Sequence, residues 1–236
     1  MSHFVAAAAC LVLVGFSVAA TAVSVVSTVN STTHAAGPST PNEAIAALLL
    51  GNARYAQGKM ESHNLPAARS GLAAGQAPFA GILRCADSRV APEIVFDQPL
   101  GDLFVCGVAG NIPTSEIIAS MEYAVAVLGT RAIVVMGHSS CGAVDAALTH
   151  RNDSTALPGS LPELIDQIIV PCAIDIDPTA PGALDTAIAC NARHGISGLL
   201  RRSRVLFDAV KKGDLKIVAG VQDLKSGRFT LLDAGN

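Results

Sequence analysis

Residues 132–149 have the sequence AIVVMGHSSCGAVDAALT. The first five residues, 132–136, form a continuous apolar run rich in β-branched side chains, which is typical of a strand covered on both faces. A short polar segment begins at Gly137, and residues 141–149 are predicted to form a helix. A buried strand that leads directly into a helix favours a sheet flanked by helices.

The segments before this stretch show the same alternation. Residues 78–83 and 102–105 are predicted to be short strands. A helix is predicted to begin at Thr114 or Ser115 and to end at Gly129, because the apolar residues between them recur at helical spacing. The sequence therefore predicts an α/β fold with a mostly parallel central β-sheet flanked by helices.

The two ends of this body also have recognisable patterns. A helix is predicted over residues 42–58, with Pro41 at its entry. Residues 216–221 and 228–232 flank Lys225-Ser226-Gly227, which indicates a β-hairpin.

The region before the hairpin is less regular. Residues 184–212 are predicted to be helical in two pieces, broken near Gly195 and Gly198. Residues 151–181 contain an apolar segment at 164–170 followed by turn residues, and they predict no definite shape.

The N-terminal segment differs from the rest of the chain. Residues 4–29 are 26 apolar or small uncharged residues, and the first Asp, Glu, Lys or Arg is Glu43. Such a run is long enough to span a bilayer as a helix, and Ala20-Thr21-Ala22 fits a signal-peptide cleavage pattern. We therefore expect a signal peptide or membrane anchor over residues 1–35, a linker over 36–41 and the folded domain over 42–236. The expected location is outside the cytosol, periplasmic or secreted, or anchored to the membrane by residues 4–29.

The composition argues against one class of partner. The formal net charge is −3 and the chain has no Trp, whereas proteins that bind nucleic acid usually carry a basic patch and aromatic stacking surfaces. We expect a small-molecule substrate and no nucleic acid.

The cysteine count indicates that some thiols are occupied. Cys10 lies in the leader, and the body contains five more. An odd number in an exported chain suggests that some of them bind a metal. Cys106, Cys172 and Cys190 are interpreted as small buried side chains that stay reduced.

Two short motifs follow predicted strands. Cys85 begins the motif Cys-Ala-Asp-Ser-Arg, and His138 and Cys141 belong to His-Ser-Ser-Cys. In an open α/β sheet, ligands bind at the carboxyl ends of the strands. If the two strands are neighbours, one imidazole and two thiolates meet there and form a zinc site with a fourth position open for catalysis. Asp87 and Arg89, two residues apart, are expected to form a charge-assisted pair.

Three other interpretations of these motifs are available, one of which has Cys85 as a nucleophile and His138 as its base. A structural zinc site fits the same donors, although it normally closes with a fourth Cys or His. Gly137 to Cys141 also follows a strand in the way a nucleophile elbow does, but Cys141 replaces the glycine that the strained turn requires.

Several segments, in order, resemble the β-class carbonic anhydrase family. The resemblance covers residues 42–232 and is carried by Gly75-Gln76-Ala77-Pro78, Cys85-Ala86-Asp87-Ser88-Arg89-Val90, Pro99 to Val105, Ala109-Gly110-Asn111, Glu122-Tyr123-Ala124-Val125, Gly137 to Ala143, Lys216-Ile217-Val218 and Asp223 to Gly227.

The resemblance implies roles for particular residues. It implies that Cys85, His138 and Cys141 bind Zn²⁺, and that Asp87 and Arg89 form the catalytic dyad in which Arg89 orients Asp87. Asp87 is a fourth zinc ligand only in a closed state, and we expect the open state near neutral pH. The substrate pocket is implied to contain Gln76, Phe104, Ala109, Tyr123 and Gly142, partly from a second subunit, so that the active form is a homodimer or a dimer-based oligomer.

One position departs from the family pattern. The family usually carries Arg at the position of Gly107, and members regulated by bicarbonate at a noncatalytic site use that Arg together with a Trp. The chain has neither, so we do not expect this regulation.

The expected activity is the zinc-dependent, reversible hydration of carbon dioxide to bicarbonate and a proton. Two alternatives remain at this point: a related zinc hydrolase of a small linear substrate such as carbon disulfide, and a catalytically silent secreted zinc-binding module.

Overall fold

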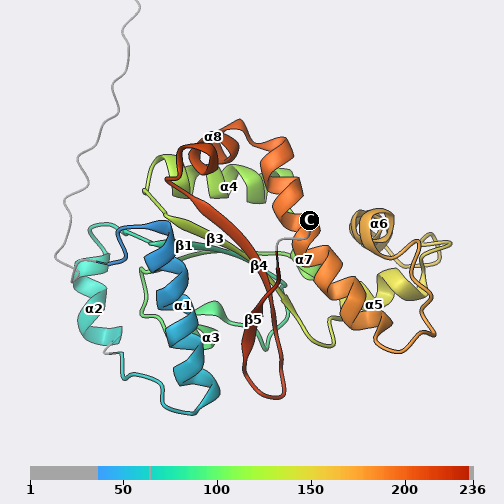
Figure 1. Ribbon diagram of the computed structural model, residues 1–236, viewed down its shortest axis with the longest axis horizontal. Helices are drawn as coiled ribbons and strands as arrows, with labels where there is room; N and C mark the ends of the chain where they lie inside the picture. Colours follow the sequence, from blue (N-terminus) through green and yellow to red (C-terminus); the bar gives the residue numbers. More distant parts are fainter. Residues whose placement is uncertain (1–36, 64, 234–236) are drawn as a thin grey trace, which may run out of the picture.

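A computed structural model describes residues 37–63 and 65–233. Within these residues the strands form one sheet in the order β2-β1-β3-β4-β5 (Figure 1). The first four strands in this order form three parallel pairs, and β5 pairs with β4 in the antiparallel direction. The predicted mostly parallel sheet and the C-terminal hairpin are therefore confirmed. The strand bounds are β1 Ala80–Arg84, β2 Leu103–Gly107, β3 Ala132–His138, β4 Lys216–Gln222 and β5 Phe229–Leu231.

Helices cover both faces of the sheet. Figure 1 shows α4 and α8 on one side of the strands and α1 and α3 on the other. The helix bounds are α1 Pro41–Ala56, α2 Leu65–Leu72, α3 Pro92–Val95, α4 Ser115–Ala126, α5 Gly142–Thr149, α6 Leu161–Cys172, α7 Ala183–Arg202 and α8 Arg204–Lys212, with a 3-10 turn η1 over Ala109–Asn111.

The apolar run of β3 serves both layers. All seven residues of β3 are buried, and successive side chains of a strand point to opposite faces. Val134 and Met136 pack into the cluster that contains residues of α1 and α3. Ile133 and Val135 pack into the cluster formed by α4, α7 and α8. A strand with two apolar faces is what a central position in a parallel sheet requires.

The N-terminal helix begins with a capping box. The Thr40 side chain accepts a hydrogen bond from the Glu43 amide, and the Glu43 carboxylate accepts one from the Thr40 amide. Pro41 is the first helical residue, so α1 starts at the last residue of the expected linker. The expected leader over residues 1–35 lies outside the described residues. No helix within residues 37–63 and 65–233 is both long enough and apolar enough to cross a membrane.

The predicted break near Gly195 and Gly198 is wrong. Helix α7 runs without interruption to Arg202, and the chain breaks at Ser203, whose hydroxyl caps α8. Both glycines make close packing possible instead. A Cβ on Gly195 would lie 2.7 Å from Cγ1 of Val135, and one on Gly198 would lie 2.6 Å from Cγ of Pro113.

The interpretation of Cys172 and Cys190 as reduced thiols is also wrong. They form a disulfide that joins the end of α6 to the middle of α7. Helix α6 occupies the region whose shape the sequence did not predict, so the packing of α6 against α7 that brings the two cysteines together was not visible in the sequence. Cys106 is free, as expected.

Candidate metal centre

The three predicted ligands come from two adjacent strands. Cys85 directly follows β1, and His138 is the last residue of β3. β1 and β3 are parallel neighbours with Arg84 opposite Met136, so their carboxyl ends lie side by side. The condition on which the zinc prediction depended is therefore met.

A tight turn brings Cys141 back to His138. Ser140 adopts a left-handed backbone conformation, with φ of 55°. The turn is held by the end of β4 and the residues after it, because the Ser139 amide donates to the Gln222 carbonyl at 2.8 Å and the Leu224 amide donates to the Ser139 hydroxyl at 2.9 Å. Cys141 is then the N-cap residue of α5.

The donor atoms have the spacing that zinc requires. The ligand atoms of Cys85, His138 and Cys141 all lie within 4.8 Å of one another, and the two sulfurs are 3.9 Å apart. Two thiolates bound to a tetrahedral zinc at about 2.3 Å each would be about 3.8 Å apart. The three side chains are almost completely buried.

His138 presents one nitrogen that lacks a hydrogen-bond partner. Its Nδ1 lies 3.0 Å from the Ser139 carbonyl oxygen, which fixes Nδ1 as the protonated nitrogen. Nε2 is buried without a hydrogen bond. A buried polar atom with no partner is costly, whereas a metal-binding histidine typically donates its other N–H to a carbonyl. The residues present therefore fit a zinc ion.

The charges of the two thiols point to the same conclusion. The hydrogen bond from Cys141, together with the Gly110 amide 3.3 Å from Sγ, lowers the pKa of the Cys85 thiol. The neighbouring Cys85 thiolate and burial raise the pKa of Cys141, although the amides of Ala143 and Val144 at the start of α5 act in the opposite direction. A divalent cation between the sulfurs removes this repulsion and allows both to be thiolates.

Asp87 and Arg89 form a bidentate ion pair beside the ligands. Arg89 donates from Nε to Oδ1 at 2.8 Å and from a terminal nitrogen to Oδ2 at 2.7 Å. Oδ2 also lies 3.9 Å from Nε2 of His138. The hydrogen bonds from Arg89 hold the pKa of Asp87 well below its usual range. An ionised carboxylate therefore faces the metal side of the centre.

The expected pocket residues are found in three places. Ala109 lies in η1 next to Gly110, and Gly142 is exposed beside Cys141 with open space where its Cβ would be. Phe104 of β2 and Tyr123 of α4 contact each other, with ring centroids 6.3 Å apart, at the edge of the sheet.

Gln76 lies at the other end of the sheet. It precedes the amino end of β1, whereas Cys85 follows the carboxyl end of the same strand. The five residues of β1 extend about 16 Å at roughly 3.3 Å per residue. Gln76 therefore does not reach the metal centre of its own chain.

The side chain of Arg84 fills the space beside Gly107. The Arg84 side chain lies against Gly107, with Cζ 3.4 Å from where a Cβ would stand. Arg84 also donates to the Cys85 carbonyl at 2.7 Å. The guanidinium next to Gly107 thus comes from β1.

Two supporting residues were not identified from the sequence. The Gly110 amide donates to Cys85, and Asn191 of α7 donates to the Gly110 carbonyl at 2.7 Å. Gly110 belongs to the Ala-Gly-Asn segment quoted above, so a signal was present. Asn191 lies in no recognisable motif.

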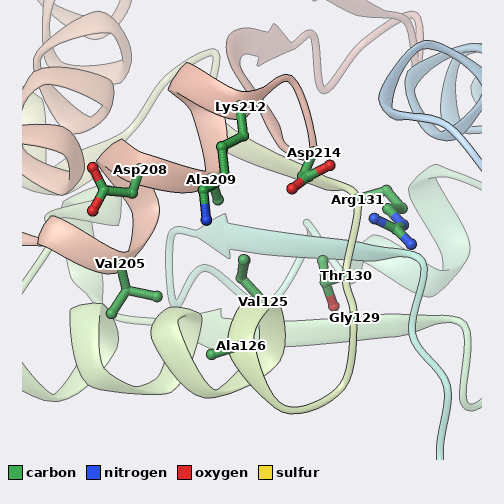
Figure 2. Close-up of a pocket in the computed structure, with 10 residues that line it drawn as sticks. All are labelled: Val125, Ala126, Gly129, Thr130, Arg131, Val205, Asp208, Ala209, Lys212 and Asp214. Atoms are coloured by element: carbon green, nitrogen blue, oxygen red, sulfur yellow. The ribbon is translucent and has the colours of Figure 1, made fainter.

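A separate cavity of about 330 Å³ lies between α4 and α8 (Figure 2). Its residues include Arg131, which precedes β3, and Asp214, which precedes β4. The cavity is therefore at the amino ends of the strands, opposite the metal ligands.

Comparisons with known proteins agree with this site. The profile of the carbonic anhydrase family matches residues 80–229. Carbonic anhydrase 2 of Mycobacterium tuberculosis is 40% identical over 194 residues, which cover 82% of this chain and 93% of the relative. The carbonic anhydrase of Mycolicibacterium smegmatis is 34% identical, with 82% and 94% covered.

Solved structures show the same fold. A tetrameric β-carbonic anhydrase of Sordaria macrospora aligns with a TM-score of 0.64 at 28% identity and covers 81% of this chain and 98% of its own. The β-carbonic anhydrase CafA of Aspergillus fumigatus aligns with a TM-score of 0.64 at 26% identity, with 81% and 92% covered. The chain therefore belongs to the β class of the carbonic anhydrase family, zinc enzymes that hydrate carbon dioxide to bicarbonate.

Proposed function

We propose that Asp87, held by Arg89, is the residue through which this zinc enzyme activates water for attack on carbon dioxide. The observation that carries the proposal is the bidentate pair, which keeps Asp87 ionised with Oδ2 3.9 Å from Nε2 of His138.

When bound by Cys85, His138 and Cys141, zinc supplies Lewis-acid chemistry that makes a water molecule more acidic. Two thiolates donate more negative charge to the zinc ion than two imidazoles would. The water would therefore be less acidic, and a neighbouring group is needed to activate it. Asp87 Oδ2 would accept a hydrogen bond from the attacking water and so orient it toward the substrate carbon. Arg89 keeps Asp87 charged and oriented. Its two side-chain hydrogen bonds hold the Asp87 carboxylate away from the metal position, which is the open state.

The substrate site is proposed to lie beside Ala109 and Gly142, which flank Cys85 and Cys141 in the structure. Carbon dioxide is small and apolar, so it needs little more than a dry surface next to the attacking water. Phe104 lies opposite Gly81, four residues before Cys85, so Phe104 and its neighbour Tyr123 would extend this surface across a subunit interface.

Stopped-flow hydration of carbon dioxide by Asp87→Ala tests the dyad. Removal of a positioned acid–base group should lower the rate by roughly 10²-fold or more, while the zinc content stays at that of the unchanged protein. Full activity in a zinc-loaded Asp87→Ala protein would exclude the proposed role. Parallel assays with carbon disulfide show whether that substrate is also used.

The active form is proposed to be a homodimer in which Gln76 completes the partner's site. Gln76 is exposed and lies at the end of β1 opposite to Cys85, so it can serve a metal centre only across an interface. The edge strand β2 and the exposed Tyr123 ring on α4 offer a surface for such an interface. The relative from Sordaria macrospora is itself described as tetrameric.

Mixing two inactive variants tests this arrangement. In a mixed dimer of Asp87→Ala and Gln76→Ala chains, one site has both residues intact if Gln76 acts across the interface. Mixing, with subunit exchange allowed, should then restore activity above the sum of the two variants. If Gln76 acts within its own chain, neither site is complete and activity stays at that sum.

Export from the cytosol is also proposed. The uncharged run over residues 4–29 and the Cys172–Cys190 disulfide support it, since disulfides persist mainly in oxidising compartments. Residues 1–41 fused to a reporter that works only outside the cytosol should give an active reporter. A soluble, cytosolic and uncleaved fusion would contradict both the secreted and the anchored form.

A further inference from the structure

Asn191 is a buried polar residue on α7, and only 3% of it is exposed. Its side-chain amide donates a hydrogen bond of 2.7 Å to the Gly110 carbonyl oxygen, across 81 positions of sequence. Because a buried amide is costly unless its hydrogen bonds are made, this contact specifies where α7 and η1 meet.

Gly110 is fixed at both of its backbone groups. Its carbonyl accepts from Asn191, and its amide donates to Sγ of Cys85 at 3.3 Å. Its backbone is left-handed, with φ of 74°, which favours glycine. Gly110 thus connects the side-chain amide of Asn191 to the zinc ligand Cys85 through two hydrogen bonds.

The surroundings leave Gly110 little freedom. A Cβ on Gly110 would lie 2.5 Å from Cδ1 of Ile168 on α6. The disulfide joins α6 to α7 close to this point, since Cys172 is one helical turn after Ile168 and Cys190 precedes Asn191. Helices α6 and α7 therefore enclose Gly110 as a linked pair.

We propose that Asn191 is a positioning residue of the metal centre. By holding the Gly110 carbonyl, it aims the Gly110 amide at Cys85 and so sets the electron density and position of that thiolate. A sulfur that accepts an N–H hydrogen bond is a weaker donor to the metal and is held in one orientation. Asn191 touches neither substrate nor metal and acts only through Gly110.

A matched control separates this role from plain stabilisation. Asn52 on α1 is equally buried at 3% and donates to two backbone carbonyls, those of Val95 and Gly227. It contacts no metal ligand. Loss of either asparagine should lower the melting temperature, but only loss of Asn191 should alter the metal.

The experiment compares Asn191→Leu with Asn52→Leu. Zinc affinity is measured by competition with a chelator, and the Cys85 thiolate is observed through the sulfur-to-metal charge-transfer band of the Co²⁺-substituted proteins. Asn191→Ala and Asn52→Ala are made in parallel, because truncation adds no bulk and keeps the comparison if a leucine variant does not fold.

We expect the Asn191 variants to bind zinc roughly 10- to 100-fold more weakly, because the loss of a fixed orientation of the Cys85 thiolate outweighs its gain in donor strength. Their charge-transfer band should move to longer wavelength, because a sulfur without its hydrogen bond gives up electron density more easily. The Asn52 variants should keep the affinity and the band of the unchanged protein. If the Asn191 and Asn52 variants match one another in zinc affinity and in band position, Asn191 only stabilises the fold and the proposal is wrong.

Discussion

Arg89 binds Asp87 along one edge of its guanidinium, so that each carboxylate oxygen receives its own hydrogen bond, at 2.8 and 2.7 Å. The Arg89 backbone amide adds a third bond to Oδ1 at 2.9 Å. A planar fork matched to a carboxylate fixes direction as well as charge. The pair therefore constrains the rotation of Asp87, which a point charge would not do.

The Arg89→Lys variant tests whether the two-point hydrogen bonding of the guanidinium to Asp87 is needed for activity. Lysine keeps the positive charge but cannot bind both oxygens in one plane. We expect the kcat/KM for carbon dioxide hydration to fall roughly 10- to 100-fold, with zinc content unchanged. Stopped-flow kinetics on zinc-loaded protein measures this. A lysine variant as active as the original chain would show that charge alone is sufficient.

Cys141→Ser should remove most of the zinc. Serine is a poor zinc ligand at neutral pH, so only His138 and Cys85 would remain of the three protein ligands. Metal analysis after dialysis against a chelator should find less than one equivalent, and the melting temperature should fall. Cys106→Ser is the control, because Cys106 is free and lies outside the centre. One tightly held zinc in the Cys141→Ser protein would contradict the ligand assignment.

Replacing Cys172 and Cys190 by Ser should destabilise the fold. Their sequence separation is 18 residues, and closing a loop of that size is worth about 3 kcal/mol of unfolding free energy. Urea denaturation of the double variant measures the loss. A reductant should lower the midpoint of the original chain and of Cys106→Ser, but it should leave the double variant unchanged. Equal midpoints with and without reductant in the original chain would argue against the bond.

Asp97 should make stability depend on acid pH. Its side chain is fully buried and accepts hydrogen bonds from Arg54, from the Glu61 amide and from His63. Burial favours the neutral acid, but the bonds from Arg54 and the Glu61 amide outweigh it and lower the pKa of Asp97. A folded-state pKa below the unfolded value of about 4 gives stability above that pH, and this stability is lost as the pH falls through the folded-state pKa.

Asp97→Asn is the matched variant, since asparagine tolerates the positive φ of 46° at this position. We expect it to cost about 2 kcal/mol of unfolding free energy at neutral pH. Denaturant titrations at a series of pH values should show the difference from the original chain shrinking below about pH 4. A difference that is constant with pH would mean that Asp97 is not charged in the folded protein.

The metal ligands could be predicted from the sequence because their positions follow from local patterns. Cys85 and His138 each come at the end of an apolar run, and a parallel sheet brings such ends to one edge. The strands needed only to be neighbours, which the pairing of β1 with β3 provides. Local sequence patterns were therefore sufficient to predict the metal ligands.

The residues that the sequence did not reveal depend on contacts between distant helices. Asn191 is an ordinary polar residue in a helical segment until α7 packs against η1. Gly195 has the pattern of a helix breaker, but its small size serves the approach of α7 to Val135. The Cys172–Cys190 bond likewise depends on how α6 meets α7. No local pattern encodes these contacts.

The hydrogen bonds that join Ser139 to the Gln222 carbonyl and to the Leu224 amide have a consequence for the order of biosynthesis. A nascent chain that has been translated only as far as α5 already carries Cys85, His138 and Cys141. The turn between two of these ligands is still unsupported, because β4 and the residues after it have yet to leave the ribosome. Pairing of β3 with β4 is also a long-range event, which is slow compared with helix formation. Maturation of the enzyme therefore waits for the last part of the polypeptide, although every atom that binds the metal was made long before.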